Sequence, residues 1–269
     1  MIDLAAPILA AMVIWWFSTG SLLWLVRQSK GIRYVTAIII TIAAAAATVA
    51  VFGLRNIDTQ IGAYLGFACG IVLWAWHEAM FLFGYVSGPR KTPCPPGLKT
   101  WPRFVVSTEA VMYHEVSIAA HGILILCLSV GAANTIAAMT FFLLWGMRLS
   151  SKLVVFLGAP NVSDHLMPPH LSYLSTYFNK TQATALFPIV MAVVTAVALA
   201  FAIVGLAAPA GGFAATGYLL IATLAGLAVI EHLALVLPVP DAVLWAWAIH
   251  KNTDTDAVPR RSRPDYGRT

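Results

Sequence analysis

The sequence predicts an all-α membrane protein, a polytopic bundle of about seven transmembrane helices. Of its 269 residues, 60% are hydrophobic and only 10% are charged, whereas a soluble domain carries about 25% charged residues. Apolar stretches long enough to cross a hydrocarbon core of about 30 Å recur along nearly the whole chain. The Lys and Arg residues fall mainly between these stretches. Together these observations exclude a water-soluble enzyme.

Seven apolar windows, each bounded by charges, Pro or Gly, have the length that a membrane helix needs. The predicted spans are residues 4–26, 34–54, 61–86, 104–130, 134–157, 184–208 and 213–237. The first window lacks a basic leading region and a small-residue cleavage site, so we expect it to be a retained span. We expect residues 1–250 to form one transmembrane domain. The charged, Pro-containing segment 251–269 is predicted to be a disordered cytoplasmic tail.

Positive charge sets the expected orientation, because Lys and Arg in short loops stay on the cytoplasmic side. All sixteen Lys and Arg residues except Arg55 lie in alternate linkers, near the end of the fifth span or in the tail. This distribution predicts a multi-pass protein of the inner-membrane type, with its N-terminus outside and its C-terminus inside. The net charge of +5 is therefore a topology signal, and we expect a lipid bilayer and no nucleic acid as partner.

Two linkers on the predicted cytoplasmic side are long enough to have structure. Residues 87–103 contain five prolines and two glycines, so we expect this linker to be extended or turn-rich rather than helical. In the second linker, residues 158–182, the segment 171–178 is predicted to form a short interfacial helix.

The three cysteines form no CxxC pair, so they indicate neither a disulfide framework nor a cysteine-based zinc site.

Ionisable residues inside the spans are the most informative feature, because a charge in hydrocarbon costs about 2.5–3.5 kcal/mol at the centre of a span unless it finds partners. They occur in four spans, and nearly all of them lie at a similar depth in the predicted cytoplasmic half. They are His77 and Glu78; Glu109, His114, Glu115 and His121; Arg148 and Lys152; and Glu231 and His232. We expect these groups to meet in one interior site, beneath the linker that carries His170.

One interpretation of this set is a metal centre, because iron, manganese and zinc use imidazole and carboxylate ligands and ferritin-like di-iron sites draw both from four helices. The candidate ligands are His77, Glu78, Glu109, His114, Glu115, His170, Glu231 and His232. Their spacing is not a standard one. The absence of an HExxH sequence excludes zincin chemistry, and the histidine boxes of membrane desaturases are missing.

Two other interpretations of the same residues stay open. Glu109, Glu115 and Glu231 can neutralise Arg148 and Lys152, which lie one turn apart on one helix face, in buried ion pairs that orient the bundle. Histidines facing each other between the third and fourth spans can instead provide axial ligands to a haem or a bacteriochlorophyll. The candidates for such cofactor binding are His77, His114 and His121.

Several short segments together carry a family resemblance over residues 60–250. They are Trp76-His77-Glu78, Gly88-Pro89-Arg90-Lys91-Thr92-Pro93-Cys94-Pro95, Tyr113-His114-Glu115, Pro168-Pro169-His170-Leu171 and Glu231-His232. With them the chain resembles the photosynthetic complex assembly family PuhE of purple phototrophic bacteria. The resemblance implies an inner-membrane protein whose gene lies with those of the reaction centre and light-harvesting complexes. It implies no agreed reaction and no functional residues.

We therefore expect an integral membrane factor for assembly of the photosynthetic reaction-centre/light-harvesting complex or for its bacteriochlorophyll supply. The resemblance implies reaction-centre or light-harvesting subunits and pigment-synthesis enzymes as partners. The alternative is a membrane-bound oxidoreductase or hydroxylase with a dinuclear iron centre, acting on a lipid-soluble pigment or its precursor.

Overall fold

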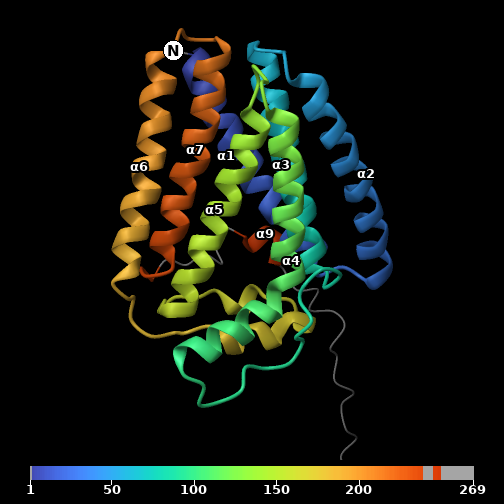
Figure 1. The fold of residues 1–269 in the computed structure, drawn as a ribbon, viewed down its shortest axis with the longest axis vertical. Coiled ribbons are helices and arrows are strands. Elements are labelled where there is room, and N and C mark those ends of the chain that lie inside the picture. Colours follow the sequence, from blue (N-terminus) through green and yellow to red (C-terminus); the bar gives the residue numbers. More distant parts are fainter. Residues whose placement is uncertain (1, 239–244, 250–269) are drawn as a thin grey trace, which may run out of the picture.

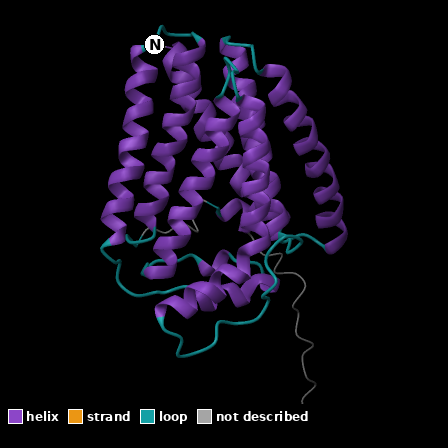
Figure 2. Cartoon of the chain, viewed as in Figure 1, coloured by secondary structure: helices purple, strands orange, loops and turns teal. Residues whose placement is uncertain are grey.

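The computed structural model describes residues 2–238 and 245–249, and the predicted tail 251–269 lies outside them. The described residues form helices and loops without a β-strand (Figure 2). Seven helices in this part of the chain are long and apolar enough to cross a membrane, which confirms the predicted all-α bundle. They are α1 (Ile2–Leu25), α2 (Lys30–Leu54), α3 (Gln60–Leu82), α4 (Thr100–Ser129), α5 (Ile136–Leu157), α6 (Leu186–Ala207) and α7 (Phe213–Ala234).

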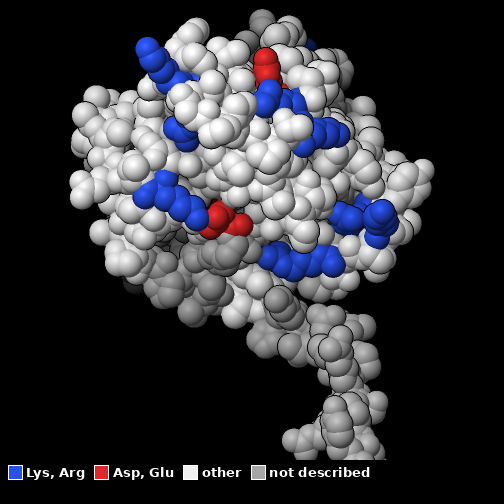
Figure 3. All heavy atoms as spheres, turned by 90° about the horizontal axis from the view of Figure 1, so that it is seen from below, with Lys and Arg blue, Asp and Glu red and all other residues white. Residues whose placement is uncertain are grey.

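The seven helices alternate in direction, so the linkers α1–α2, α3–α4 and α5–α6 all lie at one end of the bundle (Figure 1). We call this the basic end, because it carries Arg27, Lys30, Lys91, Lys99 and Lys180. Seen from this end, Lys and Arg side chains are spread around the surface and outnumber the visible Asp and Glu (Figure 3). The linkers that the sequence predicts on one side of a membrane therefore share one end of the fold.

Side-chain caps define where two of the helices begin. The hydroxyl of Ser29 accepts the N–H of Ile32 at the start of α2, and the hydroxyl of Thr59 accepts the N–H of Gly62 at the start of α3. Each cap satisfies a backbone donor that has no partner within the helix. The chain leaves α3 through Gly84, whose φ of +81° lies in the left-handed region that glycine tolerates best.

The centre of the bundle is held by close packing of α3 against α5 and α7. A Cβ atom at Gly70 would lie 2.7 Å from Cβ of Thr140, and one at Gly217 would lie 2.4 Å from Cδ1 of Ile136, so both glycines allow neighbouring helices to approach. At the end opposite the basic end, the Asn134 amide donates to the carbonyls of Ile57 and Gly62 at 3.1 and 2.9 Å. This joins the α2–α3 loop to the start of α5.

The α3–α4 linker packs directly against α4. A Cβ atom at Gly88 would lie 2.0 Å from the carbonyl oxygen of Glu109, and the Ser87 carbonyl accepts the backbone N–H of His114 at 2.9 Å. A backbone partner from outside the helix at this turn is a recognised cause of helix bending. Figure 1 shows the first turns of α4 running across the underside of the bundle before the helix enters it.

Three short helices complete the described fold, of which the smallest is η1, a 3₁₀ turn over Asp164–Leu166. The predicted interfacial helix is present as η2, a 3₁₀ helix over Pro169–Tyr177, which packs beneath α4. The segment α9 (Ala246–Ile249) returns to α1, where Trp245 packs edge-on against Trp15 with ring centroids 5.5 Å apart.

Candidate functional site

The ionisable residues predicted to form a site come largely from three neighbouring helices. His77 and Glu78 lie on α3, His114 and Glu115 on α4, and Arg148 and Lys152 on α5. His77, Glu78 and His114 are the most buried of them, with exposed fractions of 1, 8 and 1%. The three helices therefore bring polar groups into the interior, but these groups divide into two separate arrangements.

The first arrangement is a chain of hydrogen bonds through two histidines across α2, α3 and α4. Nε2 of His77 lies 3.1 Å from Nδ1 of His121, Nδ1 of His77 lies 3.4 Å from the Ser117 hydroxyl, and Nε2 of His121 lies 3.3 Å from the Thr48 hydroxyl. Thr48 itself donates to the carbonyl of Ala44 at 2.9 Å, so its oxygen accepts from His121.

The direction of the His121–Thr48 hydrogen bond fixes the direction of the other hydrogen bonds in this chain. Because Nε2 of His121 is then protonated, its Nδ1 accepts from Nε2 of His77, whose Nδ1 accepts from Ser117. Both imidazoles are neutral in this assignment, and all four ring nitrogens are engaged in hydrogen bonds. In this arrangement His77 and His121 present no free nitrogen to the central metal of a haem or a bacteriochlorophyll.

The second arrangement consists of ion pairs that join α5 to α3 and α4. Arg148 Nη2 lies 3.4 Å from Oε2 of Glu78, and Lys152 donates to Oε1 of Glu115. The second oxygen of Glu115 accepts from the indole N–H of Trp145 at 3.3 Å. Each pair satisfies a charge that would otherwise be costly inside a membrane, and it also fixes the rotation of α5.

Among the histidines whose side chains the structure describes, His114 stands apart because both of its ring nitrogens lack a hydrogen-bond partner there. Its Nε2 lies 3.9 Å from Oε1 of Glu78, which also lacks a partner, and the Phe81 ring covers it at a centroid distance of 4.6 Å. Unpaired buried polar atoms are rare in folded proteins. His114 and Glu78 are therefore the part of this interior with unused binding capacity.

The remaining candidate residues make contacts outside these two arrangements. Glu109 pairs with Arg90 at 3.8 Å, and Glu231 accepts the indole N–H of Trp15 at 2.9 Å. His232 lies 2.8 Å from the carbonyl of Ala228 and 2.9 Å from the Ser150 hydroxyl, while His170 lies at the basic end, 2.9 Å from the carbonyl of Leu82.

These contacts distribute the ionisable groups over several pairs, and the expectation that they serve one interior site stays a prediction. Among the described residues, no group of three or more His, Cys, Asp or Glu side chains is placed so that it can hold a metal ion. The physical reason is that Glu78, Glu115 and Glu109 each face a Lys or Arg, and Glu231 faces an indole. The eight predicted ligands are thus spread over separate contacts.

The structure contains ion pairs between the helices, as the ion-pair interpretation expects, but some of the partners differ from those predicted. Lys152 is neutralised by Glu115, as the sequence allows. Arg148 pairs with Glu78, which was not among the acids assigned to it, whereas Glu109 pairs with the linker residue Arg90. The spacing of residues along each helix does not reveal which neighbour a side chain faces.

Several residues that hydrogen-bond to the candidate site residues were not predicted from the sequence. They are Thr48, Ser117, Trp145, Ser150 and Trp15. Ser117 could have been predicted from the sequence, because it lies three residues after His114 and four before His121. This spacing places all three residues on the same helix face. For the others, the helix neighbours must be known first.

The fold and these cross-helix contacts define a multi-pass α-helical membrane protein with paired charges and a histidine pair in its interior. The chain belongs to the family described as "Protein of unknown function (DUF3623)", whose model matches residues 1–256. A relative from Rhodobacter capsulatus, named "Uncharacterized 30.4 kDa protein in puhA 5'region", is 30% identical over 266 residues, covering 96% of this chain and 97% of the relative. No solved structure matches the chain.

Proposed function

We propose that the protein is an integral inner-membrane factor for assembly of the photosynthetic reaction-centre/light-harvesting complex or for its bacteriochlorophyll supply, and that it acts by binding. The observation that carries the binding role is that Glu78 and Glu115 inside the bundle, and Glu231 at its surface, are each paired with a cation or an indole of another helix. Such pairs orient helices and leave no cluster of acids and histidines for redox metal chemistry among the described residues.

The biological context comes from the relative and from the family resemblance of the sequence. The Rhodobacter capsulatus relative is named for its position in the 5' region of puhA. The resemblance implies that genes of this kind lie with those of the reaction centre and the light-harvesting complexes. Both support a role in photosynthetic complex formation, with the subunits of these complexes and pigment-synthesis enzymes as proposed partners.

We also propose that the basic end faces the cytoplasm, with the N-terminus outside, because Lys and Arg in short linkers resist translocation. The three linkers at this end, including η2, then lie where newly made subunits and soluble enzymes arrive. The helices provide the remaining contact surface within the bilayer.

Within the bundle, the residue that we assign to pigment binding is His114. A bacteriochlorophyll needs a neutral imidazole with a free nitrogen as the axial ligand of its central metal. His114 is buried and has two unpartnered nitrogens, whereas the ring nitrogens of His77 and His121 are all engaged. Glu78, 3.9 Å from Nε2 of His114, would orient the imidazole or hold its proton.

Deletion of the gene in its native host tests the assembly role. We expect near-infrared absorption to show reduced reaction-centre or light-harvesting complexes, restored by the wild-type gene and less fully by His114→Phe. Unchanged complex levels and unchanged bacteriochlorophyll content in the deletion strain would refute the assembly role.

Metal and pigment analysis of the detergent-purified protein separates the binding role from catalysis. We expect well under one iron per chain. About one or two irons per chain would overturn the binding role in favour of the dinuclear iron oxidoreductase. A bacteriochlorophyll absorption band that His114→Phe removes and Ser117→Ala retains would support His114 as the ligand.

A further inference from the structure

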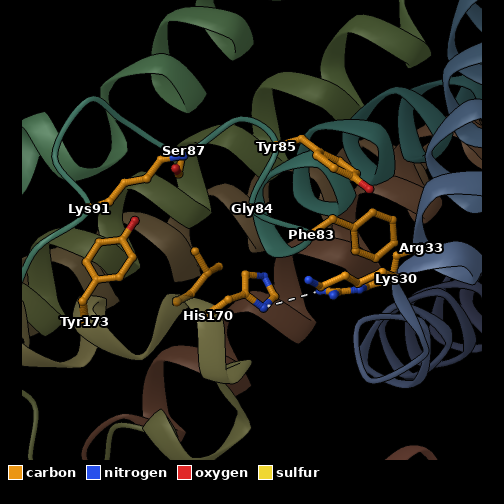
Figure 4. A pocket seen from close by; sticks show the side chains of 10 residues that line it. Lys30, Arg33, Phe83, Gly84, Tyr85, Ser87, Lys91, His170 and Tyr173 are labelled. Atoms are coloured by element: carbon orange, nitrogen blue, oxygen red, sulfur yellow. Dashed lines mark hydrogen bonds between the residues drawn. The ribbon is translucent and has the colours of Figure 1, made fainter.

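A pocket of about 390 Å³ lies at the basic end, separate from the interior histidines. Its walls come from the start of α2, the chain that follows α3, and η2 (Figure 4). The polar residues that line it are Lys30, Arg33, Tyr85, Ser87, Lys91, His170 and Tyr173. Among the residues that the structure describes, no Asp or Glu lines the pocket, so the charge of its described lining is positive.

Three polar groups in the walls of this pocket have no hydrogen-bond partner among the described residues. They are the Ser87 hydroxyl, the Tyr173 hydroxyl and Nε of Arg33, all shielded from solvent. Ser87 is 2% exposed, which makes an unsatisfied hydroxyl there costly, by about 1–3 kcal/mol. Figure 4 shows the Tyr173 hydroxyl and the Lys91 side chain directed toward the same part of the pocket as Ser87. The three unpartnered groups can each donate a hydrogen bond to an acceptor that binds in the pocket.

His170 holds Arg33 in place in this pocket. Its Nε2 lies 2.9 Å from the carbonyl of Leu82, one of the last carbonyls of α3, and must therefore donate a proton to it. Nδ1 is then an acceptor, and it faces Nη1 of Arg33 at 3.4 Å (Figure 4). A Cβ atom at Gly84 would lie 2.9 Å from the His170 ring, so glycine at this position allows the ring to approach.

The pocket therefore combines fixed positive charge with unsatisfied donors, and both require an anionic acceptor. A phosphoryl group fits this chemistry, because its oxygens accept several hydrogen bonds at once and Arg and Lys are its usual partners. The pocket also lies level with the first residue of α2 and the last of α3. That is the depth at which phospholipid headgroups meet a transmembrane bundle, and basic pockets between helices bind such headgroups.

We propose that this pocket binds a phosphoryl group, supplied by the headgroup of an anionic phospholipid or by a free phosphate. Arg33, Lys30 and Lys91 neutralise its charge, Ser87 and Tyr173 donate hydrogen bonds to its oxygens, and His170 positions Arg33. Ser87 also connects the pocket to the interior, because its carbonyl binds the backbone N–H of His114. This proposal does not depend on the assembly role.

The test is thermal unfolding of the full-length protein in detergent, titrated with phosphatidylglycerol, with phosphatidylcholine of the same acyl chains, or with inorganic phosphate. We expect phosphatidylglycerol or inorganic phosphate to raise the Tm, and phosphatidylcholine to raise it less. Arg33→Gln should weaken the apparent affinity about tenfold, the loss of one charge-assisted hydrogen bond. Lys30→Gln and Lys91→Gln change exposed side chains, so they report on binding even if Arg33→Gln folds poorly.

Lys99→Gln is the matched control, because Lys99 is exposed at the same end but does not line the pocket. Stabilisation by phosphatidylglycerol alone that the pocket variants weaken and Lys99→Gln retains identifies a lipid headgroup as the source. The same pattern with inorganic phosphate identifies a soluble phosphate. Equal stabilisation of the wild type and of the Lys30 and Lys91 variants, or no stabilisation by either anion, would overturn the proposal.

Discussion

Glu78 and His114 face each other inside the bundle with Oε1 and Nε2 3.9 Å apart, and neither atom has a hydrogen-bond partner among the described residues. The other oxygen of Glu78 is 3.4 Å from Arg148. One carboxylate thus joins a fixed ion pair to a histidine with unused nitrogens. This relationship links the part of the interior that stabilises the bundle to the part that can take a ligand.

Breaking the Glu115–Lys152 pair should destabilise the protein. Glu115→Gln leaves the Lys152 ammonium partly buried without its counter-charge, and we expect a loss of about 2 kcal/mol in the free energy of unfolding. The double variant Glu115→Gln/Lys152→Met should lose less than the sum of the single variants. Thermal unfolding in detergent measures the coupling, and additive losses would show that the two side chains do not interact.

The histidine pair should behave as one hydrogen-bonded unit. His77→Phe leaves acceptors and donors of Ser117 and His121 unpaired, which costs about 1–3 kcal/mol. His77→Phe/His121→Phe should cost little more than the first substitution, because the chain is already broken. A double variant that loses the full sum in thermal unfolding would contradict the hydrogen-bond chain.

Gly88 should be sensitive to the smallest side chain. Gly88→Ala places a Cβ atom 2.0 Å from the Glu109 carbonyl oxygen, so the linker must move away from α4, at a cost of about 1–3 kcal/mol. Gly31→Ala is the control, because a Cβ there meets nothing within 4 Å. We expect a lower Tm for the first variant and an unchanged or higher Tm for the second. Equal Tm values would show that the linker does not pack as described.

His170 should give the basic end a pH-dependent stability. Burial, together with the nearby charge of Arg33, outweighs the hydrogen bond to the Leu82 carbonyl and lowers the pKa of His170 below its ordinary value of 6.5 in the folded protein. The unfolded chain therefore binds the proton more readily, so this contribution is fully present above pH 6.5 and is lost as the pH falls below it. Lys30 and Lys91 also line this pocket, so the charged groups that face His170 there are all basic. Comparison of the Tm at pH 7.5 and about 5.5 should show a smaller decrease for His170→Gln than for the wild type; equal decreases would exclude this role.

The proposed orientation is open to a direct test with reporter fusions. A green fluorescent protein joined at Thr269 should fluoresce, because it folds in the cytoplasm, and alkaline phosphatase inserted in the loop between α4 and α5 should be active outside. A phosphatase insertion in the linker between α5 and α6 is the control and should be inactive. Activity only in that linker would reverse the orientation.

The sequence by itself determines the number and character of the helices in this protein. Each span needs about 20 apolar residues to cover the hydrocarbon, so the spans are visible one at a time and require no knowledge of their neighbours. The grouping of Lys and Arg in alternate linkers can also be recognised from the sequence alone. The alternating direction of the helices places these linkers at one end of the bundle. The short helix beneath α4 is likewise signalled by Pro168 and Pro169 and the residues that follow them.

Only the tertiary structure decided how the interior side chains are used. Adjacent residues on a helix diverge by about 100°, so His114 and Glu115 face different neighbours, and the rotation of α5 determines that Arg148 meets Glu78. Helix rotation and crossing follow from packing at Gly70, Gly88 and Gly217, where backbones approach closely. Partners such as Thr48 and Trp15 lie far away in the chain, and so does His170 from Arg33. Contacts of this kind exist only once the helices have been packed together.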